Sequence, residues 1–203
     1  MARVKLTKTE LKAQSDALKR FLRFLPMLQL KKQQLQAEIA LIVSKAEAVA
    51  AKEAACRDAL SGWISLLATD APAFEKLVRV RETKTSTSNI AGVSIPVFES
   101  LDLAVEPVDA WESPAWIDDA VASEKELLAL RAERAVCEEQ RRLVEEELRQ
   151  TSQRVNLFEK VKIPECREAI RVIKIALGDE QTAAVTRGKI AKSRAPAADG
   201  RAE

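Results

Sequence analysis

The chain has 203 residues, of which 47% are hydrophobic, 32% charged and only 4% aromatic, with no histidine and no tyrosine. This composition is typical of long helices and coiled coils rather than of a compact mixed core. The 33 basic and 31 acidic residues leave a net charge of +2. We therefore expect no nucleic-acid partner, because no broad basic field is available to neutralise phosphates.

The sequence contains little of the chemistry that enzymes use. It lacks histidine, a cysteine pair at metal-ligand spacing and a glycine-rich phosphate loop, so we predict no catalytic residue, no cofactor and no metal site. Cys56, Cys137 and Cys166 are scattered along the chain, which favours a reducing compartment. Neither a long apolar run nor a signal-peptide core occurs, so we expect a soluble, cytoplasmic protein.

The first predicted element is a long helix within residues 1–70. Apolar side chains recur at alternating steps of three and four from Leu18 to Leu67, and only Lys32 and Glu53 interrupt this stripe. Such a repeat keeps one face of a helix against a partner helix, as in a coiled coil. We call this stripe the seam.

The beginning and the end of this helix also have sequence signals. Thr7 or Thr9 is a candidate N-cap, with Glu10 three residues after Thr7 as in a capping box. Pro26 removes one helical hydrogen bond, but the seam keeps its phase on both sides, which predicts a kink and not an end. The helix is expected to stop near Pro72.

Residues 71–113 form a middle region of different character. Two short runs rich in β-forming residues, at 77–81 and 90–98, flank the polar tract 83–89, and we predict a small β-hairpin with its turn in that tract. Pro96 cannot donate to a strand ladder, which restricts the second run to an edge position.

A second long helix is predicted for residues 114–194, with Ser113 as N-cap and Pro114 at the first helical position. Its seam extends from Leu127 to Leu177. Three successive steps of four between Phe158 and Ile170 form a stutter, which locally unwinds a supercoil. The Ala-, Pro- and Gly-containing residues 195–203 are predicted to be a disordered tail.

The fold class follows from joining these elements. We predict a mainly α protein, in which the N- and C-terminal regions form a long antiparallel two-helix coiled coil and both basic chain ends lie at one tip. Heptads permit slips of seven residues, so the register is chosen by placing the seam acid Glu53 opposite the seam base Arg141. The facing pairs then include Leu67 with Leu127, Cys56 with Cys137 and Phe21 with Ile173.

Four parts of the chain resemble a known family. Their sequences include KLTKTEL and LPMLQLKK near the start, NIAGVSIPV in the middle region, QRVNLFE followed by IP in the second helix, and IKIALGD towards its end. In these stretches, and in order over nearly the whole chain, the sequence is similar to the D subunit of the V/A-type rotary ATPases, in the bacterial branch.

The resemblance implies a role. The D subunit is the non-catalytic central rotor of these machines and couples ATP synthesis or hydrolysis in the A/B catalytic hexamer to proton or other ion transport through the membrane ring. The implied partners are the A and B subunits, the F subunit and the C/d subunit of the ring socket, at the cytoplasmic face of the membrane. A shaft that turns in a bearing is also expected to have charged rather than apolar outer faces.

Two sets of contact residues follow from the resemblance as hypotheses. The hexamer-bearing contacts are assigned to basic residues at both chain ends: Lys5, Lys8, Arg187, Lys189, Lys192 and Arg194. The contact with the F subunit or the ring socket is assigned to the hairpin residues Ile90, Val93, Ile95, Val97 and Phe98.

Two other functions fit the composition and the seam. One is a structural coiled-coil tether or chaperone-like protein. The other is the stalk of a secretion-type export ATPase, which is expected to be shorter and to lack an inserted β region. Neither alternative explains the four matched stretches.

Overall fold

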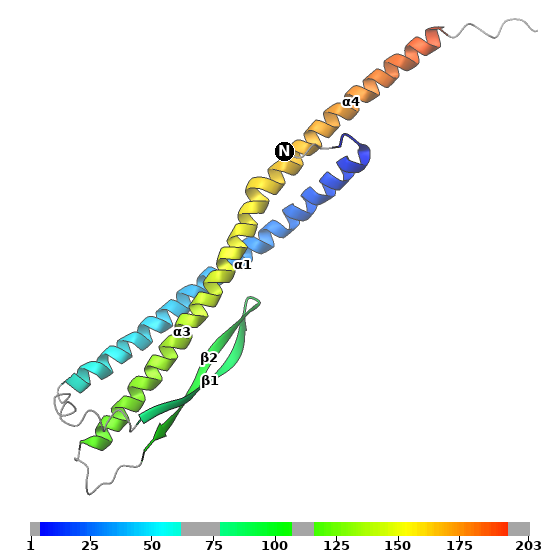
Figure 1. The fold of residues 1–203 in the computed structure, drawn as a ribbon. Coiled ribbons are helices and arrows are strands. Elements are labelled where there is room, and N and C mark those ends of the chain that lie inside the picture. The colour runs from blue at the N-terminus through cyan, green and yellow to red at the C-terminus, as the bar shows by residue number, and fades with distance from the viewer. Residues whose placement is uncertain (1–4, 62–77, 107–115, 195–203) are drawn as a thin grey trace, which may run out of the picture. The chain divides into compact units, whose positions relative to one another are not determined.

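The computed structural model describes residues 5–61, 78–106 and 116–194. In chain order the elements are helix α1 (Lys8–Ser61), strands β1 (Val78–Ile90) and β2 (Val93–Val105), helix α3 (Ile117–Leu157), the π-helical turn η1 (Phe158–Lys162) and helix α4 (Ile163–Arg194). The fold is mainly α with one antiparallel hairpin, as predicted (Figure 1). The expected helix stop near Pro72 and the N-cap Ser113 lie outside the described residues.

The seam of α1 was predicted correctly. Every predicted seam position from Leu18 to Leu60 is buried or half-buried. The helix continues through Pro26, and it begins where Thr7 Oγ1 accepts a hydrogen bond of 3.2 Å from the Glu10 amide. Spacing alone was therefore sufficient to identify the inward face of this helix.

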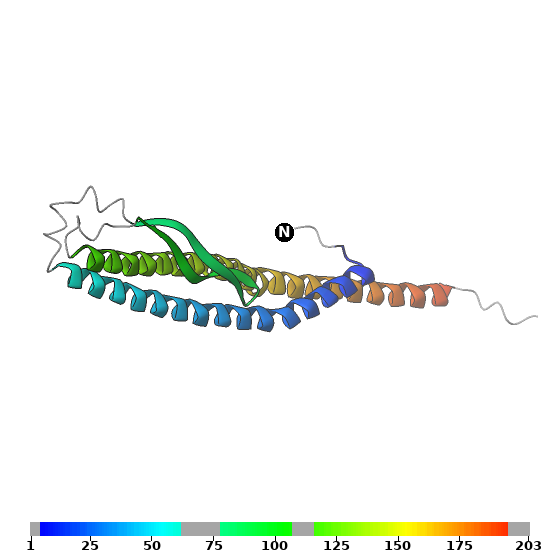
Figure 2. The same cartoon turned by 90° about the horizontal axis from the view of Figure 1, so that it is seen from below.

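The chain divides into two compact units. The central unit comprises Lys31–Thr151, and the terminal unit comprises Met1–Leu30 together with Ser152–Glu203. In each unit a segment of α1 is antiparallel to a segment of the second helical stretch. In the central unit the hairpin lies along α3, as Figures 1 and 2 both show.

The hairpin is longer than expected, and its turn lies elsewhere. Both strands have thirteen residues, and the polar tract 83–89 belongs to β1 instead of forming the turn. The turn lies at Ala91 and Gly92, whose φ angles are 50° and 85°. The tract contains alternating threonines, which are good strand formers, so its polarity was a misleading turn signal.

The predicted register is wrong by about two heptads. In the central unit Lys31 Nζ lies 2.6 Å from Glu147 Oε1 and Lys45 Nζ lies 3.3 Å from Glu133 Oε1, so that each pair of residue numbers adds to 178 and not to 194. In the terminal unit the ring centroids of Phe21 and Phe158 are 4.9 Å apart, although Ile173 was the expected partner of Phe21. The repeat permits such slips, so the choice depended on Glu53 alone.

The predicted stutter coincides with η1. The amide of Ile163 donates to the carbonyl of Phe158, five residues back, just before Pro164, which has no amide hydrogen. One extra residue is absorbed in this turn, as is usual for a π-bulge. As a result Ile163 and Ala169 are buried, instead of the predicted positions Lys162 and Ile170.

Candidate contact surfaces

The six basic residues assigned to the bearing are all exposed and all belong to the terminal unit. They do not form one cluster at a common tip. Helix α4 runs on beyond the first residues of α1 (Figure 1), so Arg187, Lys189, Lys192 and Arg194 lie on a stretch of α4 past Lys5 and Lys8. Every residue of α4 from 178 to 194 is exposed.

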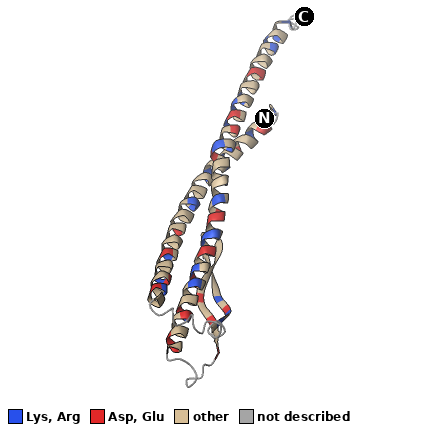
Figure 3. Ribbon diagram, turned by 60° about the vertical axis from the view of Figure 1, so that its left-hand side comes forward, with Lys and Arg blue, Asp and Glu red and all other residues tan. Residues whose placement is uncertain are grey.

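Charge is distributed unequally between the two units, although the chain as a whole is nearly neutral. The described residues of the terminal unit include sixteen Lys or Arg and seven Asp or Glu, whereas those of the central unit include fourteen and eighteen. Figure 3 shows both blue and red segments along α4, but the charged residues of its last part, 181–194, are all basic: Arg187, Lys189, Lys192 and Arg194. The terminal unit therefore has the basic field that the whole-chain charge conceals.

Exposed large apolar side chains also gather in the terminal unit. Eleven of the fourteen in the described residues belong to it. On the N-terminal part of the chain they are Leu6, Leu22, Phe24, Met27 and Leu30, and on the second helical stretch they are Leu157, Val161, Val172, Ile175, Val185 and Ile190. This finding corrects the expectation that the outer faces are charged rather than apolar.

The segment Phe21–Leu30 is apolar around its whole circumference. Only Arg23 and Gln29 interrupt it. At 100° per residue, Leu22, Met27 and Leu30 lie on an arc of about 140° opposite the seam, and their exposed fractions are 44%, 62% and 56%. The seam residues of the segment supply the remaining, inward side. A helix that is apolar on all sides is normally surrounded, so a single face of contact does not account for this segment.

Most of the assigned hairpin residues face the chain's own helices. Ile95 is 3% exposed and belongs to a core with Leu35 and Ile42 of α1 and Val144 of α3. We call these four residues the three-element core. Ile90 and Val93 pack against it, whereas Val97 and Phe98 are half-buried.

A side chain that the sequence did not single out holds the hairpin in place. Gln140 of α3 is 6% exposed, and its Nε2 donates to the carbonyl of Pro96 in β2. The predicted seam of α3 instead included Arg134 and Arg141, whose side chains are 47% and 52% exposed. The only sequence signal for Gln140 is its place between the seam residues Cys137 and Val144.

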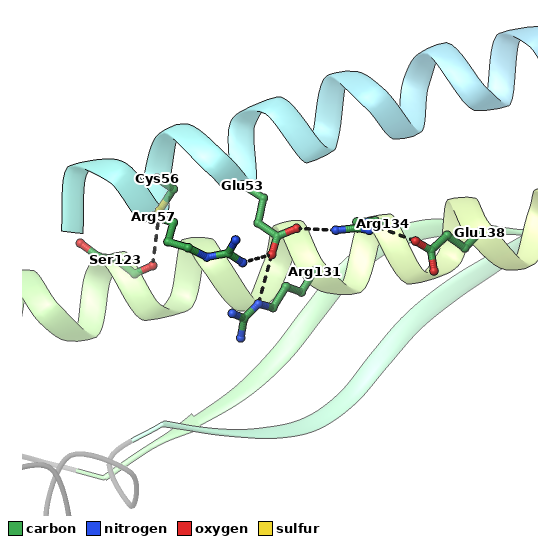
Figure 4. A network of polar contacts seen from close by, with 7 residues as sticks. All are labelled: Glu53, Cys56, Arg57, Ser123, Arg131, Arg134 and Glu138. Carbon is green, nitrogen blue, oxygen red and sulfur yellow. Dashed lines mark hydrogen bonds and ion pairs between the residues drawn. The ribbon is translucent and has the colours of Figure 1, made fainter. Parts of the chain in front are cut away.

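Glu53 is a buried acid at the centre of an ion cluster, drawn in Figure 4, whose arginine side chains are about half exposed. Its side chain is 6% exposed, and its carboxylate contacts Arg57 at 2.6 Å, Arg131 at 3.3 Å and Arg134 at 3.2 Å. Arg141 pairs with Glu145 instead, so the predicted partner of Glu53 is wrong. Two other arginines of α3 satisfy the acid equally well, which is why charge pairing did not identify the register.

The arginines of this cluster lower the pKa of Glu53. Burial acts to raise the pKa of Glu53, but hydrogen bonds from Arg134 and Arg131 and the nearby charge of Arg57 outweigh burial, so the pKa lies below its ordinary value. Glu53 is therefore ionised at neutral pH, and its charge is fully compensated.

The cysteines show no sign of reactivity. Burial raises the pKa of the Cys56, Cys137 and Cys166 thiols, which lowers the fraction of nucleophilic thiolate. Cys56 Sγ lies 4.0 Å from the Ser123 carbonyl and not opposite Cys137 as the predicted register required. Within the described ranges, no group of three or more His, Cys, Asp or Glu side chains could hold a metal ion.

No helix among the described residues is long and apolar enough to cross a membrane.

Residues 10–193 match the family model of the ATP synthase D subunit. The chain is 44% identical over 193 residues to the V-type ATP synthase D subunit of Borreliella burgdorferi, with 95% of each chain covered. It is 37% identical to the D subunit of Chlamydia muridarum and 34% to that of Chlamydia caviae, with 95% of this chain and 96% and 94% of those proteins covered.

Proposed function

The chain belongs to the family of ATP synthase D subunits, and on this premise we propose that it is the central rotor shaft of a V-type ATP synthase. In this role it has no catalytic site of its own. It couples ATP synthesis or hydrolysis in a hexamer of A and B subunits to ion transport through a membrane ring, at the cytoplasmic face of the membrane. The F subunit and the C/d subunit of the ring socket are its other partners.

The observation that carries this proposal is the construction of α1 together with the family match. Helix α1 continues for 54 residues without a break, even through Pro26. At 1.5 Å per residue this is a helix of about 81 Å, far longer than the usual helix of a globular protein. A continuous helix paired with a second one resists bending and twisting, as the transmission of torque requires.

The terminal unit is the part that we propose to enter the hexamer. Its surplus of basic residues favours a partner surface with acidic groups, and its exposed apolar side chains favour one that also offers apolar contacts. In this proposal the six basic residues contact the acidic groups. The segment Phe21–Leu30, apolar on all sides, lies where partner subunits surround the shaft.

The hairpin remains our candidate for the contact with the F subunit or the ring socket, but the residues assigned to the contact change. Val97 and Phe98 are half-buried and retain exposed surface, and Val80 and Val105 are 51% and 39% exposed. We assign the contact to these four residues. Ile90, Val93 and Ile95 act indirectly, because they fasten the hairpin to the helices.

The first test is native mass spectrometry of complexes captured through an internally tagged copy. We expect one copy of this chain together with three copies of each of two large nucleotide-binding subunits. Recovery of self-associated chain alone would contradict the rotor and favour the tether.

A second test addresses the bearing. Reversing the charges of Arg187, Lys189, Lys192 and Arg194 is expected to lower the ATPase activity that is coupled to ion transport. The matched comparison reverses two residues in each unit: Lys189 and Lys192 in the terminal unit, and as control the exposed Lys52 and Lys125 of the central unit, a change that is expected to leave coupling intact. Equal coupling in both variants would contradict the assignment.

A further inference from the structure

We propose that Glu53 selects the register in which α1 and α3 pair, and that it thereby determines where the hairpin is held. Glu53 is the single acid in the seam of α1. It is a positioning residue in this proposal, which depends only on the central unit and not on the proposed role of the chain.

The apolar seam cannot select the register by itself. Leu35, Ile42 and Val49 follow one another at intervals of seven residues, and all three are buried. A slip by one heptad would move α1 about 10.5 Å along α3 and replace each apolar contact by a similar one. Only positions that differ chemically from their heptad neighbours can distinguish the registers.

Glu53 differs in this way, and its surroundings are specific. Carboxylate Oε1 contacts Arg57 Nη2 and Arg131 Nε, whereas Oε2 contacts Arg134 Nη1. Both oxygens are used, and two of the three arginines come from the opposite helix. Removing such a buried acid from its partners is costly, because an uncompensated charge would stay in the interface.

The neighbouring heptads of α3 are unfavourable for an acid. Seven residues before Arg131 and Arg134 lie Glu124 and Leu127, and seven residues after them lie Glu138 and Arg141. A slip in either direction therefore brings Glu53 towards a like charge. After a slip to the later heptad Arg141 would replace Arg134, since each of these arginines also pairs with an acid of α3, but Glu138 would replace Arg131 and oppose Glu53. The register observed is the one that places Glu53 between bases.

The position of the hairpin depends on this register. The three-element core requires Leu35 and Ile42 of α1 to lie beside Val144 of α3 and Ile95 of β2. Gln140 fastens β2 to α3 independently of α1. After a slip, the hairpin would remain attached to α3 but would meet a different part of α1.

The register can be read by crosslinking pairs of cysteines in the full chain. In a Cys56→Ser background, a short bis-maleimide joins Lys31→Cys to Glu147→Cys only in the observed register, because these side chains are in contact. Two other pairs report slips by one heptad in opposite directions: Glu38→Cys with Glu147→Cys, and Lys45→Cys with Glu126→Cys. Mass spectrometry of the digested product identifies the crosslink.

With Glu53 present, we expect only the pair that reports the observed register to react. With Glu53→Leu, helical circular dichroism should be retained while one of the slipped pairs also reacts. The control Glu139→Gln removes an exposed acid that pairs with Arg142 within α3, and it should leave the crosslinks unchanged. Exclusive crosslinking in the observed register with Glu53→Leu would overturn the proposal.

If Glu53→Leu loses its helicity, a second variant tests the same proposal. Replacing Arg131 and Arg134 by glutamine leaves Glu53 with Arg57 of its own helix alone. Slipped crosslinks in this variant would support the proposal, whereas crosslinking in the observed register alone would refute it.

Discussion

Both units are built from two antiparallel helical segments, but they differ in where their large apolar side chains lie and in which residues their ion pairs join. The central unit directs its large apolar residues inward, and only Leu41, Val80 and Val105 are exposed among those described. It also has ion pairs between helices, such as Lys31 with Glu147. The terminal unit exposes eleven large apolar residues, and its ion pairs, such as Lys162 with Glu165, lie within one helical stretch.

This difference indicates which unit is complete by itself. The interior of the central unit is formed by α1, α3 and the hairpin, so its stability should depend on its own side chains. The terminal unit has apolar surface that its own helices do not cover, so part of its stabilisation should come from partners. Substitutions in the two units should therefore affect different measurements.

The largest expected effect is the loss of a core side chain from the central unit. Leu35 is 0% exposed, and Leu35→Ala should lower the free energy of unfolding by about 2–5 kcal/mol, because a cavity is left behind. Leu41 of the same helix is 64% exposed, and Leu41→Ala should change it by less than about 0.5 kcal/mol. Urea denaturation of the purified chain measures both, and equal losses would contradict the assignment of the core.

Loss of the hairpin anchor should have the next largest effect. Gln140→Leu leaves the Pro96 carbonyl without its partner and should cost about 1–3 kcal/mol. Relative to the wild-type chain, hydrogen exchange in Gln140→Leu should become faster for the hairpin amides and change less for the α3 amides. Gln150→Leu is the control, since Gln150 bonds only the exposed Glu146 of its own helix. Unchanged exchange in the hairpin would show that Gln140 does not hold it.

Loss of exposed apolar side chains from the segment Phe21–Leu30 should affect binding rather than stability. The double variant Leu22→Ala with Met27→Ala should barely alter unfolding of the free chain, because both side chains are exposed. It should weaken binding to the A/B hexamer by about tenfold, as expected when interface apolar contacts worth about 1.4 kcal/mol are lost. Binding is measured by titration of the hexamer, with Leu41→Ala as the control. Undiminished binding would exclude this segment from the interface.

A smaller effect is expected from acid titration of the Glu53 cluster. Arg57 on its own helix and Arg131 and Arg134 on α3 face this carboxylate and hold its pKa below the ordinary 4.5. Its contribution is therefore present above pH 4.5 and is lost as the pH falls through the lowered folded-state pKa. The stability difference between the wild-type chain and Glu53→Gln should shrink over that range. A difference independent of pH would argue against the ionised cluster.

The smallest effect is expected from a glycine of α4. Gly188 has nothing within 4 Å of the position of an added Cβ, and Gly188→Ala should stabilise the helix by about 0.5–1 kcal/mol. Thermal unfolding followed by circular dichroism is the measurement. Gly92→Ala, in the hairpin turn at φ 85°, should have the opposite sign. Stabilisation by both substitutions would contradict the turn geometry.

Periodic features of the fold can be predicted from the sequence, whereas the pairing of distant segments cannot. The seam of α1 is a periodic signal and was identified residue by residue, including the buried Glu53. The register was not, since a heptad repeat is unchanged by slips and Glu53, the polar seam residue used to choose it, has several suitable partners. Gln140 was missed because the contact it makes depends on a hairpin distant in sequence.

The candidate contact residues stay a prediction, and no periodic pattern marks them in the sequence. Basic side chains are conspicuous in a sequence, and the six that were assigned are indeed exposed. Met27 and Leu30 lie outside the predicted seam and are exposed, but an apolar residue outside the seam is not by itself a sign of a contact. A usable signal was nonetheless present, since Phe21–Leu30 has only two polar side chains and therefore no polar face.

One residue of the hairpin turn bears on the order in which the chain folds. Ala91 adopts a left-handed φ of 50°, where asparagine or glycine is preferred, while its methyl group packs against the three-element core. The turn is thus a weak local nucleus, and its strain is offset only once α1 and α3 are in place. We expect the hairpin to form after the helices pair, so that its amides gain protection later than those of α3 in pulse-labelling hydrogen exchange. Ala91→Asn should narrow that delay by strengthening the turn.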